Sequence, residues 1–311
     1  MDHLKEAPDY LQDDHLSRGT KAYLKVLNGG APVESLPVGE ARRVLTDVQA
    51  AVYVDLSGIE ESERTVESEG HTLRLNLVRP SGAGRVHLPA FVFIHGGGWV
   101  LGDYPTHRRL VRDLVVESGC AAVFVNYTPS PEAHFPKAVE EVYAAVKWVA
   151  ENGREIGVDG SRLALAGNSV GGPRLRTLVL MWPVTDAGYD WDSYVKYGRQ
   201  RFLTAPLMKW MFGKYVSDPA QRGNDLMSPV RASAERLRGL PPTLIAVAEN
   251  DILRDEGEAM GRRLDEAGVE VTTVRFNGVV HDWGMLNGFA TLPPTRSLIL
   301  FSAAMLKRYL E

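Results

Sequence analysis

A series of short apolar runs, separated by longer segments with helical patterning, constrains the fold of this chain most strongly. The runs cover residues 90–94, 121–125, 163–166, 178–181, 244–248 and 271–276. Uninterrupted apolar runs of this length are typical of strands covered on both faces, as in the middle of a parallel sheet. Residues 72–78 instead alternate apolar and polar side chains, which predicts a half-buried strand.

Helical segments lie between these runs. They are expected at about 106–117, after Pro136 (with Val139, Val142, Val146 and Val149 on one stripe), at 256–267 before Gly268, and at about 296–310. Strands that alternate with helices predict an α/β fold with a mostly parallel, doubly wound sheet.

Two segments depart from this alternation. Residues 1 to about 52 have amphipathic helical patterning, with Val44, Leu45, Val48 and Val52 at helical spacing. Residues 187 to about 230 are rich in aromatic side chains, among them the seven residues Trp191, Tyr194, Tyr197, Phe202, Trp210, Phe212 and Tyr215. Two interpretations stay open for the second segment, namely ordinary core or a lid that covers an apolar pocket together with the N-terminal helices.

Composition excludes several classes of function. The net charge of -4 gives no basic footprint for nucleic acid or for an anionic membrane surface. The single cysteine, Cys120, cannot form an internal disulfide or a Cys-rich metal site, and its apolar neighbours predict a buried, inert thiol. The first residues lack a signal-peptide layout, and no run reaches the length of a membrane span, so we expect a cytoplasmic protein without stable membrane insertion.

The segment Gly167-Asn168-Ser169-Val170-Gly171 directly follows an apolar run. It matches the G-x-S-x-G pattern, in which a serine projects from a sharp strand-to-helix turn. The flanking glycines fit a turn where a Cβ atom would clash with backbone. This pattern alone is weak, because an ordinary glycine-rich turn gives the same match. Ser169 is nevertheless the candidate nucleophile.

A second glycine-rich segment, His95-Gly96-Gly97-Gly98-Trp99, follows another apolar run. Bare backbone N–H groups in such a loop can face a developing negative charge, as in an oxyanion hole. The alternatives are a flexible loop or a phosphate-binding loop, but neither common phosphate-loop pattern is present. We expect His95 and Gly96 to support the shape of this loop.

An acid and a histidine follow the last two runs. Asp251 lies just past the run at 244–248, and His281 lies past the run at 271–276. Asp255 is the less favoured acid, because Asp255 and Glu256 have the character of first-turn helix residues. Of the eight histidines, His281 alone follows the acid and lies in a loop after a late strand. The order serine, acid, histidine predicts a catalytic triad of Ser169, Asp251 and His281.

These segments resemble the bacterial hormone-sensitive-lipase-like esterases, from about residue 70 to the end of the chain. The resemblance also includes Asn126-Tyr127, Pro131-Glu132, Phe135-Pro136, Gly172 and the segment Leu253-Arg254-Asp255-Glu256. It implies an α/β-hydrolase fold, with a helical cap segment at 1–60, a catalytic domain at 61–311 and a second cap segment at 187–230. It also implies that Gly97, Gly98 and Val170 supply the oxyanion-hole N–H groups. The activity that it implies is hydrolysis of short- to medium-chain acyl esters, a carboxylesterase reaction.

The chain departs from this family at two points. Asn168-Ser169-Val170 stands where the family usually has Asp-Ser-Ala, which can alter the wall of the pocket. After Gly172 the family has a helix of about four turns, whereas here Pro173 leads almost directly into the run at 178–181. A parallel crossover usually needs a dozen or more residues. Either the printed sequence omits residues that the protein contains, which we favour because a sheet without this helix would be exposed, or the helix is deleted.

Other functions stay open on the same scaffold. An amidase or a lactonase would use the same triad, and a non-catalytic binding protein would keep the fold alone. All three triad residues are present, which favours an enzyme. We expect a small-molecule acyl ester as substrate, no nucleic acid partner, and no metal or organic cofactor. Both a monomer and a homodimer are compatible with the sequence.

Overall fold

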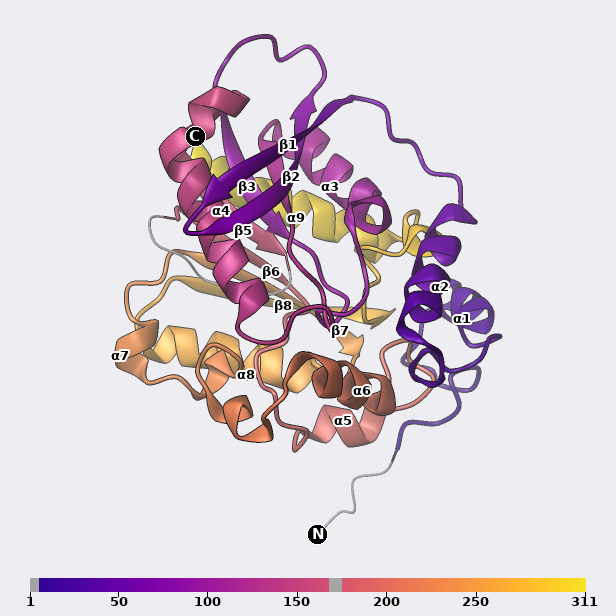
Figure 1. Ribbon diagram of the computed structural model, residues 1–311. Helices are drawn as coiled ribbons and strands as arrows, with labels where there is room; N and C mark the ends of the chain where they lie inside the picture. Colours follow the sequence, from indigo (N-terminus) through magenta and orange to yellow (C-terminus); the bar gives the residue numbers. More distant parts are fainter. Residues whose placement is uncertain (1–5, 168–174) are drawn as a thin grey trace.

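A computed structural model describes residues 6–167 and 175–311, and in these residues the chain forms an eight-stranded sheet of order β1-β2-β4-β3-β5-β6-β7-β8 (Figure 1). The strands are β1 Ile59–Ser68, β2 His71–Pro80, β3 Leu88–Ile94, β4 Ala121–Asn126, β5 Val158–Gly167, β6 Leu178–Met181, β7 Thr243–Asn250 and β8 Val271–Val280. The pairs β1–β2 and β2–β4 are antiparallel, and the other five are parallel. The predicted α/β fold with a mostly parallel sheet is confirmed.

Helices cover both faces of this sheet (Figure 1). The helices α3, Tyr104–Ser118, and α9, Pro293–Leu310, pack against each other on one face. The helices α4, Lys137–Asn152, and α8, Arg254–Glu266, lie on the opposite face, over β5 and β7 respectively. This distribution follows from the strand order, because right-handed crossovers that move in opposite directions along the sheet place their helices on opposite faces.

Strand β1 was not predicted from the sequence. Its segment, IEESERTVES, is mostly charged or polar, and Val66 is its one buried residue. The strand lies at the edge of the sheet and pairs only with β2, so an exposed, polar composition is tolerated and also discourages pairing with other chains.

Helices from two distant parts of the sequence lie together at one end of the molecule (Figure 1). These are α1, Arg18–Leu27, and α2, Val38–Ala50, together with α5, Asp192–Tyr197, and α6, Ala205–Tyr215. Most of the aromatic residues of α5 and α6 belong to the core, since Tyr194, Tyr197, Phe212 and Tyr215 are buried.

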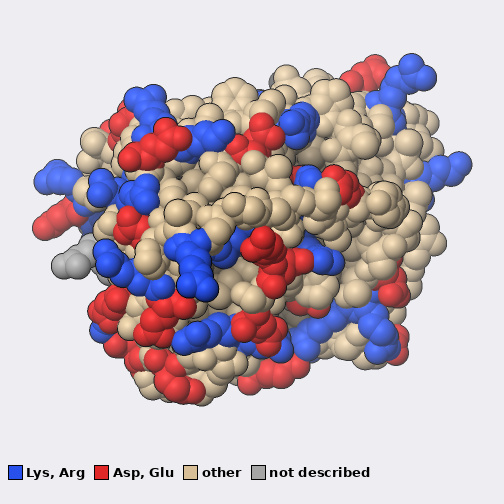
Figure 2. Space-filling view, turned by 90° about the horizontal axis from the view of Figure 1, so that it is seen from above, with Lys and Arg blue, Asp and Glu red and all other residues tan. Residues whose placement is uncertain are grey.

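Charged side chains of both signs are interspersed on the face shown in Figure 2. In the described residues, no helix has both the length and the apolar character needed to cross a bilayer. The thiol of Cys120 is 2% exposed, as its apolar neighbours predicted. Burial raises the pKa of this thiol, which keeps it in the unreactive protonated form.

Strands β5 and β6 are parallel neighbours, with Leu165 opposite Leu178. The chain between them includes residues 168–174, which lie outside the described residues. The prediction about a helix after Gly172 therefore concerns residues outside the described part of the chain. The predicted site residues Ser169 and Val170, and Asn168 between Gly167 and Ser169, also lie outside it.

Candidate active site

The register of two parallel strands brings an acid and a histidine together. Asn250 at the end of β7 pairs with Val280 at the end of β8, so the next residues, Asp251 and His281, leave the sheet side by side. His281 Nδ1 lies 2.7 Å from Asp251 Oδ2, and both side chains are buried. The second oxygen of Asp251 accepts a hydrogen bond of 3.0 Å from the backbone N–H of Leu253. Both oxygens of the acid are thus held in place, and the contact sets Nδ1 as the protonated nitrogen of a neutral imidazole.

The less favoured acid has another role. Asp255 accepts a hydrogen bond from the backbone N–H of Ser193 on α5 and forms an ion pair of 2.7 Å with Arg254. The structure therefore brings Asp251, and not Asp255, to His281.

Charge and burial act in opposite directions on His281. Burial lowers its pKa, but the carboxylates of Asp251 and Asp282, together with the hydrogen bond that its Nδ1–H donates to Asp251, raise the pKa, and the net shift is upward. Such a histidine accepts a proton readily at neutral pH, which is what a general base requires.

Sequence reasoning did not single out Asp282. Its carboxylate lies 3.8 Å from His281 Nε2, the nitrogen that faces away from Asp251. Asp282 is 6% exposed and has a φ of 59°, in the left-handed region that non-glycine residues rarely adopt. Burial raises the pKa of this carboxyl, although His281 counteracts that effect. The one available signal was a charged residue next to the candidate histidine.

The two strands that precede the other candidate segments also end side by side. Ile94 at the end of β3 pairs with Gly167 at the end of β5. Gly167 has a φ of 130°, and a Cβ atom there would lie 2.0 Å from the carbonyl oxygen of Ile94. Only glycine fits this close approach. The glycine-rich loop thus starts next to the strand end from which the chain continues to Ser169.

Two glycines shape the loop after β3. Gly97 and Gly98 have φ values of 106° and 59°, and Cβ atoms on them would lie 2.2 Å from Leu101 O and from Met211 Sδ respectively. Within the described part of the chain, neither of their N–H groups donates a hydrogen bond to a protein acceptor. Two unpaired amide donors are what an oxyanion hole provides.

His95 is part of the scaffold of this loop. Its ring stacks between Tyr127 and Phe124, with ring centroids 4.2 and 5.3 Å away. Its Nδ1 donates to the carbonyl oxygen of Gly96 at 2.9 Å, and the Tyr127 hydroxyl donates to the carbonyl oxygen of His95. Burial lowers the pKa of His95 to about 4, so the ring is neutral at physiological pH.

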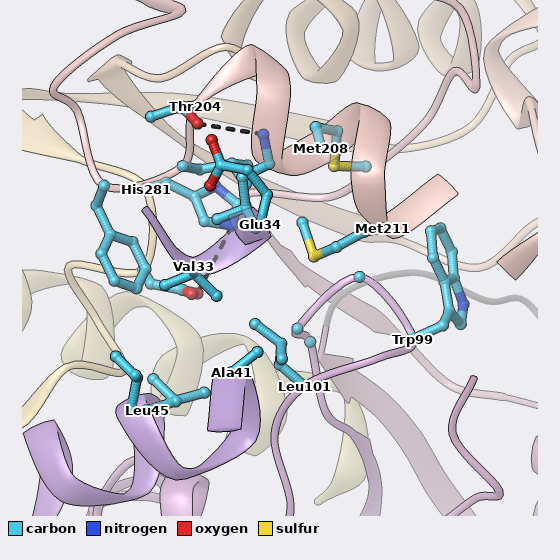
Figure 3. A pocket seen from close by; sticks show the side chains of 18 of the residues that line it. Val33, Glu34, Ala41, Leu45, Trp99, Leu101, Thr204, Met208, Met211 and His281 are labelled. Carbon is cyan, nitrogen blue, oxygen red and sulfur yellow. Dashed lines mark hydrogen bonds and ion pairs between the residues drawn. The ribbon is translucent and has the colours of Figure 1, made fainter. Parts of the chain in front are cut away.

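A cavity of about 590 Å³ lies in front of His281 and the glycine loop (Figure 3). Its walls come from α2, from the loop after β3, and from the segment that leads into α6. The lining is mostly aliphatic and sulfur-containing, and Val44, Leu45, Val48, Leu207, Met208 and Met211 belong to it. Three residues of the predicted stripe, Val44, Leu45 and Val48, therefore face the cavity, whereas Val52 lies beyond the end of α2 and does not line it. Of the seven aromatic residues named in the second segment, Phe202 is the one that lines the cavity.

This arrangement of a mostly parallel sheet, a histidine–carboxylate pair at its carboxyl edge and a facing loop of bare amides defines the α/β-hydrolase class of enzymes. The described residues contain no group of three or more His, Cys, Asp or Glu side chains that could hold a metal ion.

Comparisons with known proteins identify the family. The model of a family described as alpha/beta hydrolase fold matches residues 91–285, and the chain belongs to this family, in its hormone-sensitive-lipase-like branch. The crystal structure of a thermostable esterase from Pseudomonas putida ECU1011 is 49% identical, covers 95% of this chain and 98% of its own, and superposes with a TM-score of 0.93.

Curated relatives point to the same enzyme class. An ethyl acetate hydrolase of Pseudomonas putida is 31% identical over 295 residues, which cover 84% of this chain and 90% of the relative. The carboxylesterase NlhH of Mycobacterium tuberculosis is 32% identical over 266 residues, with 80% and 82% covered. The predicted family and the predicted class, a carboxylic-ester hydrolase, are confirmed.

Proposed function

We propose that this chain hydrolyses short- to medium-chain acyl esters, with Ser169 as nucleophile, His281 as general base and Asp251 as the residue that orients the histidine. The observation that carries the proposal is the 2.7 Å contact between Asp251 and His281 beside an apolar cavity. Strand β5, which leads to Ser169, ends at the same edge of the sheet. Relatives named esterase, carboxylesterase and ethyl acetate hydrolase support the same reaction.

The reaction proceeds through a covalent acyl-enzyme. Ser169 Oγ attacks the ester carbonyl carbon while His281 Nε2 takes the hydroxyl proton, and the carbonyl oxygen becomes an oxyanion. When the tetrahedral intermediate collapses, His281 returns the proton to the departing alkoxide, which leaves as the alcohol. Water then attacks the acyl-enzyme by the same route and releases the carboxylic acid. No step in this scheme uses a metal or an organic cofactor.

The loop after β3 stabilises the charge that develops in these steps. The free N–H groups of Gly97 and Gly98 donate to the oxyanion, together with the N–H of Val170. Fixed donors cost little reorganisation when the charge forms, and each contributes about 10²–10³ in rate. The cavity of about 590 Å³ accepts the acyl or alcohol part of the ester, and its aliphatic walls favour apolar chains.

A fluorophosphonate probe tests the nucleophile. We expect it to label the wild type and Ser81→Ala, in which an exposed turn serine is replaced, but not Ser169→Ala, and nitrophenyl ester turnover to follow the labelling. Turnover by Ser169→Ala within tenfold of the wild type would contradict the assignment. A wild type that is neither labelled nor active would point to a binding protein on the same scaffold.

Further measurements define the substrate, the cellular location and the oligomeric state. Nitrophenyl esters of rising acyl length give the chain-length limit, and a matched nitroanilide and lactone test the amidase and lactonase alternatives. We place the protein in the cytoplasm, supported by a single buried cysteine; cell fractionation tests this, and light scattering decides between monomer and homodimer.

A further inference from the structure

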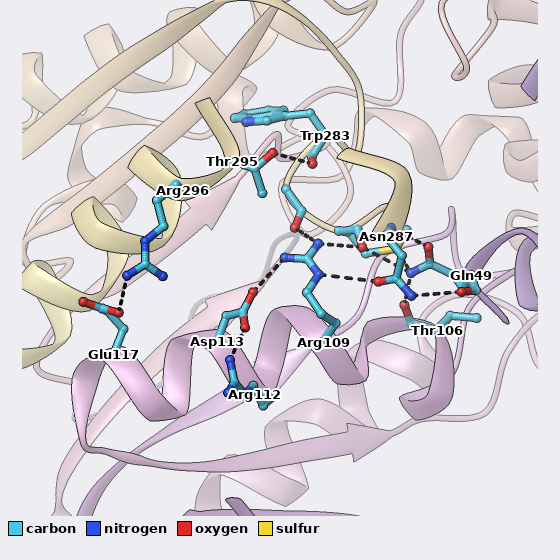
Figure 4. Close-up of polar contacts among 12 residues, drawn as sticks. Gln49, Thr106, Arg109, Arg112, Asp113, Glu117, Trp283, Asn287, Thr295 and Arg296 are labelled. Atoms are coloured by element: carbon cyan, nitrogen blue, oxygen red, sulfur yellow. Dashed lines mark hydrogen bonds and ion pairs between the residues drawn. The ribbon is translucent and has the colours of Figure 1, made fainter. Parts of the chain in front are cut away.

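A buried arginine, Arg109, forms hydrogen bonds with the chain segment that follows His281 (Figure 4). Arg109 of α3 is 4% exposed and does not line the cavity. Its Nη2 donates to the carbonyl oxygens of Gly284 and Met285, the latter at 2.9 Å, and its Nε lies 3.4 Å from Asn287 Oδ1. The guanidinium thus contacts the chain three, four and six residues after His281.

The chain between His281 and these contacts is closed by its own hydrogen bonds. The N–H groups of Met285 and Leu286 both donate to the carbonyl oxygen of Asp282, at 2.9 Å each. From the other side, Thr295 Oγ1 donates to the carbonyl oxygen of Trp283 at 3.1 Å. Because this turn is compact, a shift of Gly284 and Met285 is expected to shift His281 as well.

A glutamine from the N-terminal helices joins the same cluster. Gln49 of α2 is 5% exposed, and its Nε2 donates to the carbonyl oxygens of Thr106 and Met285. Asn287 returns two hydrogen bonds, from its N–H to Gln49 Oε1 at 2.8 Å and from its Nδ2 to the carbonyl oxygen of Gln49 at 3.0 Å. On the same helix, Leu45, one turn before Gln49, and Val48, directly before it, line the cavity. The helix that lines the cavity and the segment that carries His281 therefore share one polar cluster.

Burying a guanidinium is costly unless its hydrogen bonds are satisfied. Asp113, one turn further along α3, neutralises Arg109 through an ion pair of 3.0 Å. Arg112 shares that carboxylate, also at 3.0 Å, but its other contacts are with Asp55 and Ser57. The chain thus offers two arginines with the same partner on the same helix, only one of which touches the histidine segment.

We propose that Arg109 is a positioning residue for His281. Gln49 connects α2 to the same segment through hydrogen bonds, so the cavity wall and the catalytic base keep a fixed position relative to each other. The proposal rests on the proposed function of His281 as general base. It names neither Arg109 nor Gln49 as catalytic, because neither lines the cavity.

The test compares Arg109→Met with Arg112→Met, using a nitrophenyl ester as substrate. We expect Arg109→Met to lower kcat by about 10- to 100-fold with KM within threefold, because small displacements of a catalytic group have effects of this size. The acid limb of its pH profile should move to lower pH, since a displaced imidazole loses part of the pKa-raising contact with Asp251. Arg112→Met should leave the acid limb in place even if it lowers the melting temperature.

Three controls separate the outcomes. Arg109→Lys keeps the charge near the two carbonyl oxygens and should restore part of kcat. Gln49→Met should lower kcat, and its combination with Arg109→Met should cost less than the product of the two effects, because both residues hold the same segment. Equal losses in Arg109→Met and Arg112→Met, or an unmoved acid limb in Arg109→Met, would overturn the proposal. A wild type that resists the fluorophosphonate probe would instead overturn the proposed function.

Discussion

At the scale of single residues, Asp282 is the side chain that adds to the effect of Asp251 on the pKa of His281. Its carboxylate lies 3.8 Å from His281 Nε2 and contributes to the raised pKa of the imidazole. In the proposed mechanism the general base is neutral His281, so we expect activity to be lost as pH falls through this pKa. We therefore expect the acid limb of kcat/KM for the wild type to have its midpoint above pH 6.5, the usual value for a histidine.

Replacement of Asp282 by Asn removes the charge and keeps the shape. The pKa of His281 should fall, so Asp282→Asn should stay active at lower pH than the wild type. Asp225→Asn, which removes a carboxylate that pairs with Arg236, serves as the control and should keep the wild-type profile. If the acid limb of the kcat/KM profile has the same midpoint in Asp282→Asn as in the wild type, the carboxylate of Asp282 does not affect the pKa of His281 in solution.

Parts of the candidate site could be predicted from the sequence because they depend on chain order. Asp251 and His281 each follow an apolar run, and the parallel register of β7 and β8 then forces them together. Asp282 and Arg109 could not be predicted in this way. The role of Asp282 depends on a left-handed backbone that turns its carboxylate toward Nε2, and that of Arg109 on carbonyl groups more than 170 residues away. The direction of a side chain and the positions of distant carbonyl groups produce no recognisable pattern in the local amino-acid sequence.

At the scale of elements, the loop that we propose as the oxyanion hole packs closely against α6. A Cβ atom on Gly98 would lie 2.2 Å from Met211 Sδ, whereas one on Gly97 would lie 2.2 Å from the backbone oxygen of Leu101. Shortening Met211 to alanine removes the sulfur and its methyl group but keeps a Cβ atom 2.9 Å away, so it relieves the clash in part, whereas a backbone carbonyl cannot be removed. The two glycines therefore differ in whether a second substitution can relieve the clash.

We expect Gly98→Ala to lower kcat/KM by about 10²–10³, the effect of losing one oxyanion donor. Adding Met211→Ala should restore about tenfold, because relief of about 1.4 kcal/mol in the clash corresponds to that factor. Gly97→Ala should lose a similar amount and gain nothing from Met211→Ala. This prediction is tested by measuring kcat/KM for Gly97→Ala, Gly98→Ala, Met211→Ala and the two double variants. A Gly98→Ala/Met211→Ala variant no faster than Gly98→Ala would show that the loop shape does not depend on this contact.

Element prediction succeeded where the pattern had a single physical cause. Strands β3 and β7 are uninterrupted apolar runs because both of their faces are covered. The stripe on α2 was ambiguous, because apolar side chains at helical spacing face either a core or a cavity. Val44 is 37% exposed although it belongs to that stripe, and it lines the cavity. A sequence pattern records that a helix has an apolar face but not whether protein or substrate covers it.

At the scale of the whole molecule, the layers of helices bear on the helix that the family resemblance places after Gly172, in a segment that lies outside the described residues. Helix α9 packs across β6 from one face of the sheet, whereas on the other face α4 packs on β5 and α8 on β7. The helix that the family resemblance places after Gly172 would lie between α4 and α8, over β6. Buried strands need cover on both faces, so the physical cost of losing this helix falls on the centre of the sheet.

The intact mass of the protein made from its natural coding sequence tests this directly. The printed sequence corresponds to 34.3 kDa. A helix of about four turns has about 14 residues, so we expect a mass about 1.5 kDa higher, with the extra residues recovered by peptide sequencing immediately after Gly172. A measured mass of 34.3 kDa would mean that the chain truly lacks the helix. Ser169 would then have no helix N-terminus behind it to help polarise the oxyanion, and the glycine-loop amides would carry that stabilisation with less support.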